Sequence, residues 1–200
     1  MIIFLNGTSS SGKSSIAKAL QELYHTPLLH VGLDTFFFML PPQYLGQGAK
    51  AHEGFQFLTQ EDEEGPITHV HPGSYAQALC RTTIDVIQLM ANRDHDLVVD
   101  ELLFREESLK HYVEALENHT VYFIGIHCEP HILKEREIAR GDRTPGLGRA
   151  LVHRVHRPTH PYDLELNTTN TSPKENAQHI LNFIKQTSQP QGFEKLRKYK

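Results

Sequence analysis

Residues 7–14 read Gly-Thr-Ser-Ser-Ser-Gly-Lys-Ser and match the pattern G-x-x-x-x-G-K-[ST]. An apolar run at 2–5 precedes them and helical periodicity begins at residue 14, so the motif lies between a predicted strand and a predicted helix. Glycines let the backbone wrap a phosphate, while main-chain N–H groups and the helix N-terminus supply fixed positive potential. This context favours a phosphate-binding loop for ATP over a chance Gly/Ser-rich turn.

The side chains of this loop and of a neighbouring strand have distinct expected roles. Lys13 can reach the β- and γ-phosphates of ATP, and the Ser14 hydroxyl can ligate Mg²⁺. Asp100 ends an apolar run and is predicted to hold Mg²⁺ directly or through water; an exposed carboxylate at a strand end is the alternative. The role of Glu101 is left open. The predicted nucleotide-binding residues are Gly7, Thr8, Ser9, Ser10, Ser11, Gly12, Lys13, Ser14 and Ser15, together with Arg136.

Short apolar runs alternate with helical patterns along the chain, which predicts an α/β fold with a parallel sheet and helices on both faces. We expect one domain over 1–188. Within it, polar residues 41–72 form an insertion that contains a hairpin, and 141–148 form a loop. The expected strands are 2–5, 28–31, 96–100, 121–127 and 164–168, and the expected helices are 14–25, 74–92, 106–117, 130–140 and a last helix that Ser172 caps.

Composition excludes several classes of protein. The chain has 200 residues and a formal net charge of −4, which does not indicate a nucleic-acid binder. Its one basic run is at the end, and we predict 189–200 to be a solvated, frayed tail. Cys80 and Cys128 lie far apart without metal-ligand spacing, as is typical of reduced thiols in a cytoplasmic protein. No stretch approaches the roughly 20 apolar residues that span a membrane, and no pattern specifies an oligomeric state.

Further features favour a small kinase. A GTPase would need a guanine-reading Asn-Lys-x-Asp element, which the sequence lacks. Asp34 follows the second predicted strand, where a carboxylate can orient and deprotonate a substrate hydroxyl. A helix N-cap is the alternative role for Asp34, and the two roles are compatible. Residues 168–173 form a polar loop that can border adenine or simply connect two elements.

Arg136, Arg140 and Arg143 are spaced by four and three residues, which brings them together around a helix end. Residues 141–157 are therefore predicted to form a lid whose guanidinium groups close over ATP and offset charge in the transition state. A solvated basic helix face is the alternative. The predicted catalytic residues are Lys13, Asp34, Arg140 and Arg143, and the weaker arginine candidates are Arg149, Arg154 and Arg157.

One set of segments forms a recognisable combination: residues 5–14, Val31-Gly32-Leu33-Asp34, Val98-Val99-Asp100-Glu101, residues 135–143, Val155-His156 and residues 162–168. With these segments the chain resembles the chloramphenicol phosphotransferase family of P-loop kinases. The resemblance extends from residue 2 to about residue 180 and is patchy over 41–75. It implies a three-layer, adenylate-kinase-like sheet of strand order 2-3-1-4-5, with Asp34 as the base and Arg140 and Arg143 acting from the lid.

The leading hypothesis is an ATP- and Mg²⁺-dependent O-phosphotransferase that phosphorylates a hydroxyl of a small molecule. The resemblance points to chloramphenicol and hence to antibiotic resistance. Phenylalanines at 36–38 would suit a hydrophobic acceptor, or they belong to the core. Because 41–72 departs from the family pattern and is expected to line the acceptor pocket, a nucleotide, a sugar nucleotide as in zeta-toxin-like kinases, or a metabolite are alternative acceptors. A nucleotide-dependent regulatory protein without an acceptor is the alternative from another class.

Overall fold

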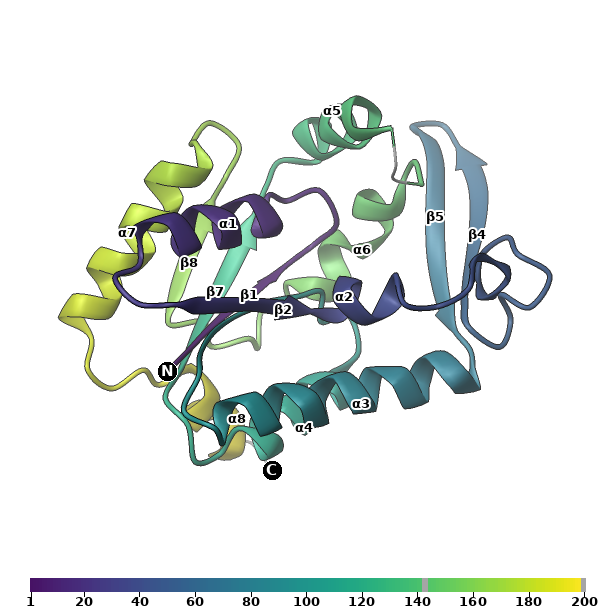
Figure 1. Ribbon diagram of the computed structural model, residues 1–200. Coiled ribbons are helices and arrows are strands. Elements are labelled where there is room, and N and C mark those ends of the chain that lie inside the picture. Colours follow the sequence, from purple (N-terminus) through teal and green to yellow (C-terminus); the bar gives the residue numbers. More distant parts are fainter. Residues whose placement is uncertain (142–143, 199–200) are drawn as a thin grey trace.

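A computed structural model describes residues 1–141 and 144–198 (Figure 1). Its main sheet has five strands in the order β2 (Leu28–Gly32), β6 (Asp96–Glu101), β1 (Ile2–Gly7), β7 (Val121–His127) and β8 (Leu164–Asn167). Every neighbouring pair is parallel. Counted along the chain, these strands have the order 2-3-1-4-5, so the expected topology is confirmed.

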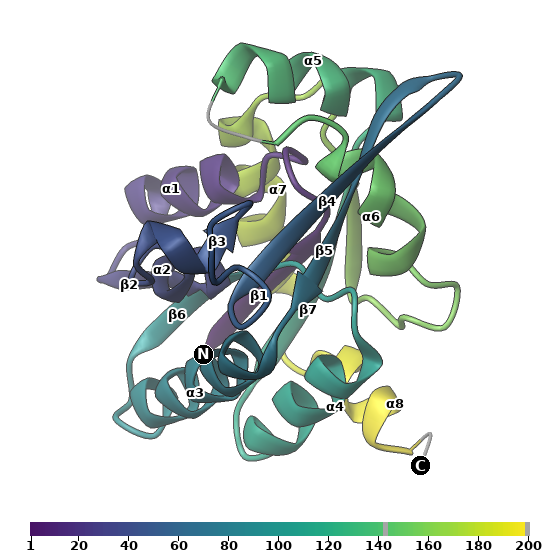
Figure 2. The same ribbon diagram turned by 90° about the vertical axis from the view of Figure 1, so that its right-hand side faces the viewer.

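Side chains that alternate along the buried strands supply two cores, one on each face of the sheet. Ile3 and Leu5 of β1 pack beneath α1 (Lys13–Leu23) and α7 (Pro173–Gln186). Ile2 and Phe4 pack on the opposite face against α3 (Ser74–Ala91), α4 (Glu106–Ala115) and α8 (Gly192–Lys198). Figures 1 and 2 show the resulting three layers. Both faces of a strand such as β1 are buried, which is why it is an uninterrupted apolar run.

Two helix starts follow from local capping chemistry. The Ser172 hydroxyl accepts a hydrogen bond from the Glu175 N–H at 3.2 Å, and the Glu175 carboxylate accepts one from the Ser172 N–H at 2.8 Å. This capping box confirms Ser172 as the N-cap of α7. Helix α5 (Pro130–Arg140) begins at a proline and is followed by Gly141 in the left-handed region, with φ of 66°.

The predicted insertion forms a long hairpin outside the main sheet. Strands β4 (Phe55–Asp62) and β5 (Gly65–Pro72) pair antiparallel as far as Asp62 and Gly65, so the hairpin is confirmed and is longer than expected. Before it come α2 (Leu33–Phe37), a 3₁₀ turn (Pro42–Tyr44) and β3 (Leu45–Gly46), which pairs with β4. Figure 2 shows that the hairpin crosses the molecule and reaches α5 and α6 (Leu147–Val155) with its tip.

Helix α6 occupies most of the segment that was predicted as a lid, and the sequence interpretation did not recognise it as a helix. Its buried residues, Leu147, Leu151 and Val155, recur every four positions and pack against Val70 of β5. The glycines at 141, 146 and 148 favour a loop in the sequence, although the apolar residues that follow are spaced as in a helix. The lid region therefore contains a helix with its own small core, shared with the hairpin.

The predicted frayed tail is wrong for the residues that the structure describes. Helix α8 buries Phe193 against the core, where the side chain is 3% exposed. Asp163 accepts hydrogen bonds from the N–H groups of Gln191 and Gly192 at 2.6 and 2.8 Å. Arg197 donates to the Leu116 carbonyl at 3.2 Å. The described part of the C-terminal segment is thus a docked helix, which Phe193 and Leu196 anchor to the core.

None of the helices in the described parts of the chain is both long enough and apolar enough to cross a lipid bilayer.

Candidate active site

The phosphate loop between β1 and α1 is tightly folded and buried. Ser10 and Gly12 adopt positive φ angles of 61° and 96°, which wrap the backbone around a concave space. A Cβ atom on Gly7 would lie 2.6 Å from the Ile126 carbonyl oxygen, so only glycine fits there. The Thr8 carbonyl accepts a hydrogen bond from Lys13 Nζ at 3.0 Å, which holds the lysine over the loop.

Three serine hydroxyls in the loop indicate what the concave space can bind. The side-chain oxygens of Ser9, Ser10 and Ser11 are buried and have no hydrogen-bond partner among the described residues. Buried hydroxyls without partners are costly, and polar groups of this kind are ordinarily satisfied by a ligand or water. Phosphate oxygens would accept these three hydrogen bonds. The loop therefore fits the phosphates of a nucleotide.

Asp100 lies beside the loop because β6 pairs in parallel with β1 and with β2. The Ser14 hydroxyl donates to its carboxylate at 2.5 Å, and Lys13 Nζ lies 3.7 Å from its other oxygen. His30 Nε2 lies 3.5 Å from the same carboxylate. Burial alone would raise the pKa of Asp100, but the charge of Lys13 and hydrogen bonds from His30 and Ser14 outweigh it and lower the pKa. Asp100 is therefore a mostly buried, ionised carboxylate.

The Ser14 hydroxyl and the ionised Asp100 carboxylate are oxygen ligands of the type that Mg²⁺ prefers. Within residues 1–141 and 144–198, no group of three or more His, Cys, Asp or Glu side chains could hold a metal ion by itself. A magnesium ion at Ser14 and Asp100 would therefore need phosphate oxygens and water as its other ligands. Ser14 and Asp100 fit such an ion only together with a nucleotide, and their role as metal ligands stays a prediction.

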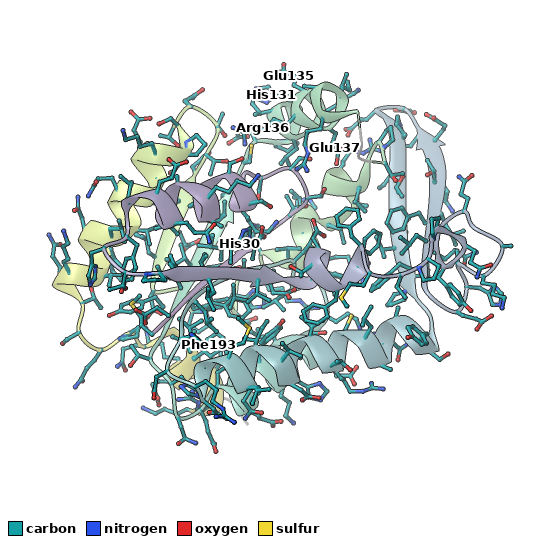
Figure 3. The ribbon with its side chains drawn as sticks, in the orientation of Figure 1. His30, His131, Glu135, Arg136, Glu137 and Phe193 are labelled. Atoms are coloured by element: carbon teal, nitrogen blue, oxygen red, sulfur yellow. The ribbon has the colours of Figure 1, made fainter. Side chains whose placement is uncertain are left out.

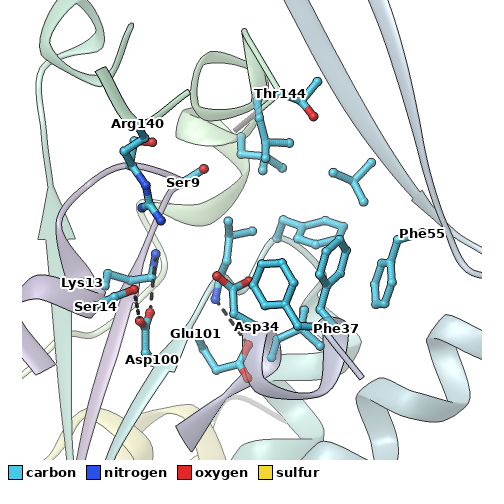
Figure 4. A pocket seen from close by; sticks show the side chains of 18 of the residues that line it. Ser9, Lys13, Ser14, Asp34, Phe37, Phe55, Asp100, Glu101, Arg140 and Thr144 are labelled. Carbon is cyan, nitrogen blue, oxygen red and sulfur yellow. Dashed lines mark hydrogen bonds and ion pairs between the residues drawn. The ribbon is translucent and has the colours of Figure 1, made fainter. Parts of the chain in front are cut away.

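A cavity of about 160 Å³ opens beside the loop and Asp100. Its polar side includes Lys13, Ser14 and Arg140, and Asp34 lies on its wall. Figure 4 shows Lys13, Ser14 and Asp100 on one side of this space, Phe37 on the other, and Asp34 between them. The apolar wall comes from α2, the hairpin, the segment after β6 and α6, and consists of Leu33, Phe37, Phe38, Phe55, Phe57, Val70, Leu102, Phe104, Leu147 and Leu151.

Asp34 is not the N-cap of α2. The helix starts at Leu33 with Gly32 as its N-cap, and Asp34 lies in the first turn. A Cβ on Gly32 would come within 2.0 Å of the Asp100 carbonyl oxygen, so the chain must have glycine where β2 passes β6. The close approach of these strands brings Asp34 to the cavity. The alternative prediction that Asp34 caps the helix is therefore wrong. Asp34 instead lies on the cavity wall, where a catalytic base would have to be.

Arg136 and Arg140, which were predicted to form one cluster, lie in different places in the structure. Arg140 lines the cavity near Lys13. Arg136 instead lies under the phosphate loop, where its guanidinium donates to the Thr168 carbonyl at 2.7 Å and to the Ser11 carbonyl at 3.5 Å. Thr168 Oγ1 also donates to the Ser11 carbonyl at 2.7 Å. Arg136 and the predicted adenine-side loop thus brace the phosphate loop from behind. Arg143 lies outside the described residues, and its role stays a prediction.

The weaker arginine candidates contact other side chains. Arg149 forms ion pairs with Asp62 at 2.8 Å and Glu64 at 3.2 Å in the hairpin tip. Arg154 lies over the Phe104 ring at 5.1 Å, and Arg157 pairs with Glu106. Arg149 and Arg154 connect α6 to its surroundings, Arg157 does so for the segment that follows α6, and none of the three lines the cavity.

Glu137 fixes the start of α6, a role that the sequence interpretation missed. Its buried carboxylate accepts hydrogen bonds from the N–H groups of Gly146 and Gly148 at 3.0 and 2.6 Å. The Gly148 carbonyl in turn accepts one from the Thr8 hydroxyl of the phosphate loop at 3.0 Å. In Figure 3, Glu137 points from α5 toward α6. The sequence alone does not single out Glu137, because the 135–143 segment also contains Glu135 and Asp142.

Glu101, which the sequence left open, is 4% exposed at the end of β6 and lies on the cavity wall. Tyr112 donates a hydrogen bond to its carboxylate at 2.7 Å. Burial, together with the nearby Asp100 charge, raises the pKa of Glu101 to about 7 despite that hydrogen bond. The pKa of Glu101 is raised whereas that of Asp100 is lowered, because Lys13 and His30 lie beside Asp100 only.

The phenylalanines at 36–38 were expected either to line the acceptor pocket or to belong to the core, and the structure shows some in each place. Phe36 packs against the core, whereas Phe37 and Phe38 line the cavity. Phe55 and Phe57 alternate along β4 and complete the wall, as the expected position of the 41–72 segment requires. Five of the ten residues in the apolar wall are thus aromatic, and they come from segments far apart in the sequence.

Other family-matching residues serve the scaffold. The Asn6 side chain donates to the Tyr162 hydroxyl at 2.7 Å and to the Val155 carbonyl at 3.2 Å. His156 lies 3.1 Å from the same hydroxyl and stacks on His127. Burial, and secondarily the neighbouring His127, lower the pKa of His156 to about 4. This network links β1 to the end of α6 behind the phosphate loop.

The strand order and the loop between β1 and α1 define a P-loop protein of the kinase type. A family model described as chloramphenicol phosphotransferase-like protein matches residues 1–185, and the chain therefore belongs to that family. Two proteins from Mycobacterium tuberculosis, strains CDC 1551 and H37Rv, are 30% identical over 98% of this chain and 88% of their own length; both carry the provisional name O-phosphotransferase.

Solved structures agree on the fold. The chain is similar to the M. tuberculosis APS kinase CysC in complex with AMPPNP and APS, with 17% identity, a TM-score of 0.62, and 92% and 96% coverage of the two chains. It is also similar to a gluconokinase from Sinorhizobium meliloti, with 15% identity, a TM-score of 0.60, and 92% and 91% coverage. At these identities the similarity concerns the fold alone.

Proposed function

We propose that the protein is an ATP-dependent O-phosphotransferase that acts in the cytoplasm and phosphorylates a hydroxyl of a small, partly aromatic molecule. The observation that carries this proposal is the shared cavity, where Asp34 lies between the phosphate loop and the aromatic wall. The provisional names of the M. tuberculosis relatives and the AMPPNP bound to the similar APS kinase support this proposal.

In this proposal the chain binds the two reactants from opposite sides. The loop residues Gly7 to Ser15 hold the ATP phosphates, and Arg136 keeps the loop in shape. The aromatic wall holds the acceptor and orients its hydroxyl toward the γ-phosphate, since correct orientation supplies much of the rate in phosphoryl transfer. A nucleotide-dependent regulatory protein would have no need of a carboxylate between these sides.

Asp34 is proposed to accept the proton of the acceptor hydroxyl as the oxygen attacks the γ-phosphorus. Lys13, Arg140 and Arg143 are proposed to offset the negative charge that spreads over the phosphoryl oxygens. Ser14 and Asp100 would hold Mg²⁺, which neutralises phosphate charge when bound. Excluding water matters because water would otherwise accept the phosphoryl group, and the apolar residues of α6 cover that side of the cavity.

A screen of ADP release tests the proposal. Purified protein receives Mg²⁺, ATP and one of a panel of hydroxyl compounds that includes chloramphenicol, nucleosides and sugars, with Lys13→Ala as the control. We expect at least one aromatic alcohol to stimulate ADP release by the wild-type protein only, and mass spectrometry to detect the phosphorylated alcohol. No stimulation across the panel would count against the proposal.

A further inference from the structure

His30 lies on the edge strand β2, beside the Asp100 carboxylate that is proposed to hold Mg²⁺ (Figure 3). In the parallel pairing of β2 with β6, His30 is opposite Val98 and Gly32 is opposite Asp100. Side chains alternate between the two faces of a sheet, so His30 and Asp100 point to the same face, the one that α1 covers. Because Gly32 has no side chain, His30 is the nearest residue of β2 whose side chain can reach the carboxylate.

Polar groups from two different elements hold the Asp100 carboxylate. From the start of α1, the Ser14 hydroxyl donates to the Oδ2 atom at 2.5 Å, and Lys13 Nζ lies 3.7 Å from the Oδ1 atom. From β2, His30 Nε2 lies 3.5 Å from the same Oδ2 atom. The orientation of the carboxylate therefore depends on the sheet as well as on the phosphate loop.

His30 differs from the other two neighbours because it has no proposed contact with the nucleotide. Ser14 is proposed to ligate the ion itself, and Lys13 is proposed to contact phosphate oxygens. In the part of the chain that the structure describes, the one ion-pair partner of His30 is Asp100. When the two loop residues contact the ion and the phosphates, His30 is the neighbour that can still hold the carboxylate.

The contact between His30 and Asp100 is largely shielded from water, because their side chains are only 24% and 11% exposed. A separation of 3.5 Å is long for a hydrogen bond, and contacts of this kind often shorten when a site binds its ligands. A group that orients a metal ligand typically contributes roughly 10–100-fold to metal affinity or activity. His30 has the position of such a group.

We propose that His30 is a positioning residue that donates a hydrogen bond from Nε2 to Asp100 and so holds the carboxylate in the orientation that binds Mg²⁺ together with ATP. This inference rests on the proposed function, because that function takes Ser14 and Asp100 as ligands of the ion. His30 acts through Asp100 and does not contact the nucleotide. Its loss should therefore weaken the binding of Mg²⁺ and leave the binding of the phosphates by the loop intact.

Binding of the ATP analogue AMPPNP, measured by calorimetry once with Mg²⁺ and once with EDTA, tests the inference without any turnover. The ratio of the two dissociation constants reports the contribution of the ion. His30→Leu keeps the bulk of the side chain but has no donor. We expect its affinity for AMPPNP with Mg²⁺ to fall about tenfold, while its affinity in EDTA matches that of the wild-type protein.

Two further variants and one measurement on the wild-type protein complete the test. His30→Gln has an N–H donor and should restore most of the Mg²⁺ effect, and His25→Leu, at an exposed position, should match the wild-type protein. If His30→Leu does not fold, NMR of the histidine rings in the wild-type protein shows which ring nitrogen of His30 carries a proton. The proposal requires a proton on Nε2, the atom that faces Asp100; a proton on Nδ1 alone overturns it.

The outcomes distinguish this inference from the proposed function. A Mg²⁺ effect in His30→Leu equal to that in the wild-type protein overturns the role of His30. An equal loss of AMPPNP affinity with and without the ion also overturns it, because His30 would then support the structure of the loop as a whole. ADP release with the panel of hydroxyl compounds is measured separately. If the Mg²⁺ effect depends on His30 but no compound is phosphorylated, the proposed phosphoryl transfer fails while the positioning of Asp100 by His30 stands.

Discussion

The Ser14 hydroxyl lies 2.5 Å from a carboxylate oxygen of Asp100, although the two residues are 86 positions apart in the chain. The parallel pairing of β1 with β6 creates this contact, because it places the loop that follows β1 beside the end of β6. Lys13 reaches the same carboxylate at 3.7 Å. The Lys13 ammonium group and two oxygen groups that could bind a metal ion, those of Ser14 and Asp100, therefore lie together beside the phosphate loop.

Asp100→Asn is expected to lower kcat/KM for Mg-ATP by about a hundredfold, the size of effect that follows the loss of one electrostatic contact in a transition state. The amide is a poor ligand for Mg²⁺, so more of the ion should be needed for half-maximal rate. Activity is measured against Mg²⁺ concentration. Asp85→Asn removes the same charge from an exposed position on α3 and should leave the curve unchanged. An unaltered magnesium requirement in Asp100→Asn would contradict the assignment.

Phe193→Ala tests whether the C-terminal helix belongs to the fold. The side chain is 3% exposed and packs edge-on against Phe123. Its removal should lower the free energy of unfolding by about 3 kcal/mol, as is usual for a buried aromatic residue. Urea unfolding measures the loss, and the exposed Lys195→Ala is the control. A change within 0.5 kcal/mol, the usual range for surface substitutions, would instead support a frayed tail.

His156 predicts a pH dependence of stability. Its pKa is about 4 in the folded protein and about 6.5 in an unfolded chain. Between these values the unfolded chain binds a proton that the folded chain does not, so stability should fall as pH decreases from 6.5 to 4. Thermal unfolding across this range measures the slope. The slope should be smaller in His156→Gln and unchanged in His25→Gln, which alters an exposed histidine; equal slopes in all three proteins would exclude His156.

Arg149 is expected to fasten the lid helix to the hairpin. Its guanidinium contacts Asp62, Glu64 and the Gly65 carbonyl at the hairpin tip. Exposed ion pairs contribute little to global stability, so Arg149→Gln should leave the melting temperature almost unchanged. Amide hydrogen exchange should nevertheless become faster at the hairpin tip and at the start of α6. Arg157→Gln, which removes a pair with Glu106, is the control. Exchange that is equal in both variants would exclude this link.

The fold could be predicted from the sequence because its signals are local. The run at 2–5, the loop at 7–14 and the capping residue Ser172 each express their structure within a few positions, and all were placed correctly. Helix α6 was missed because its stabilising contacts come from the hairpin, through residues such as Val70. Phe193 was missed because its burial depends on Phe4 and Phe123, far away in the chain.

The candidate site divides in the same way. Lys13 and Ser14 follow from a motif, and Asp34 and Asp100 from the ends of predicted strands. Arg136 shared its spacing with Arg140, yet only the structure shows that it faces Thr168 and not the cavity. The groups that a helical side chain contacts depend on how the helix packs against other elements. The spacing of residues along the sequence does not contain this information.

We propose that Asp34 activates the acceptor hydroxyl for attack on ATP bound at the phosphate loop. The Asp34→Asn variant tests this role most directly. The variant keeps the size of the side chain and leaves the loop intact, so its dissociation constant for ATP, measured by calorimetry, should match that of the wild-type protein. Acceptor-stimulated ADP release should fall at least about a hundredfold, the range of a lost general base. Unchanged acceptor-stimulated turnover, with ATP binding also unchanged, would contradict the account.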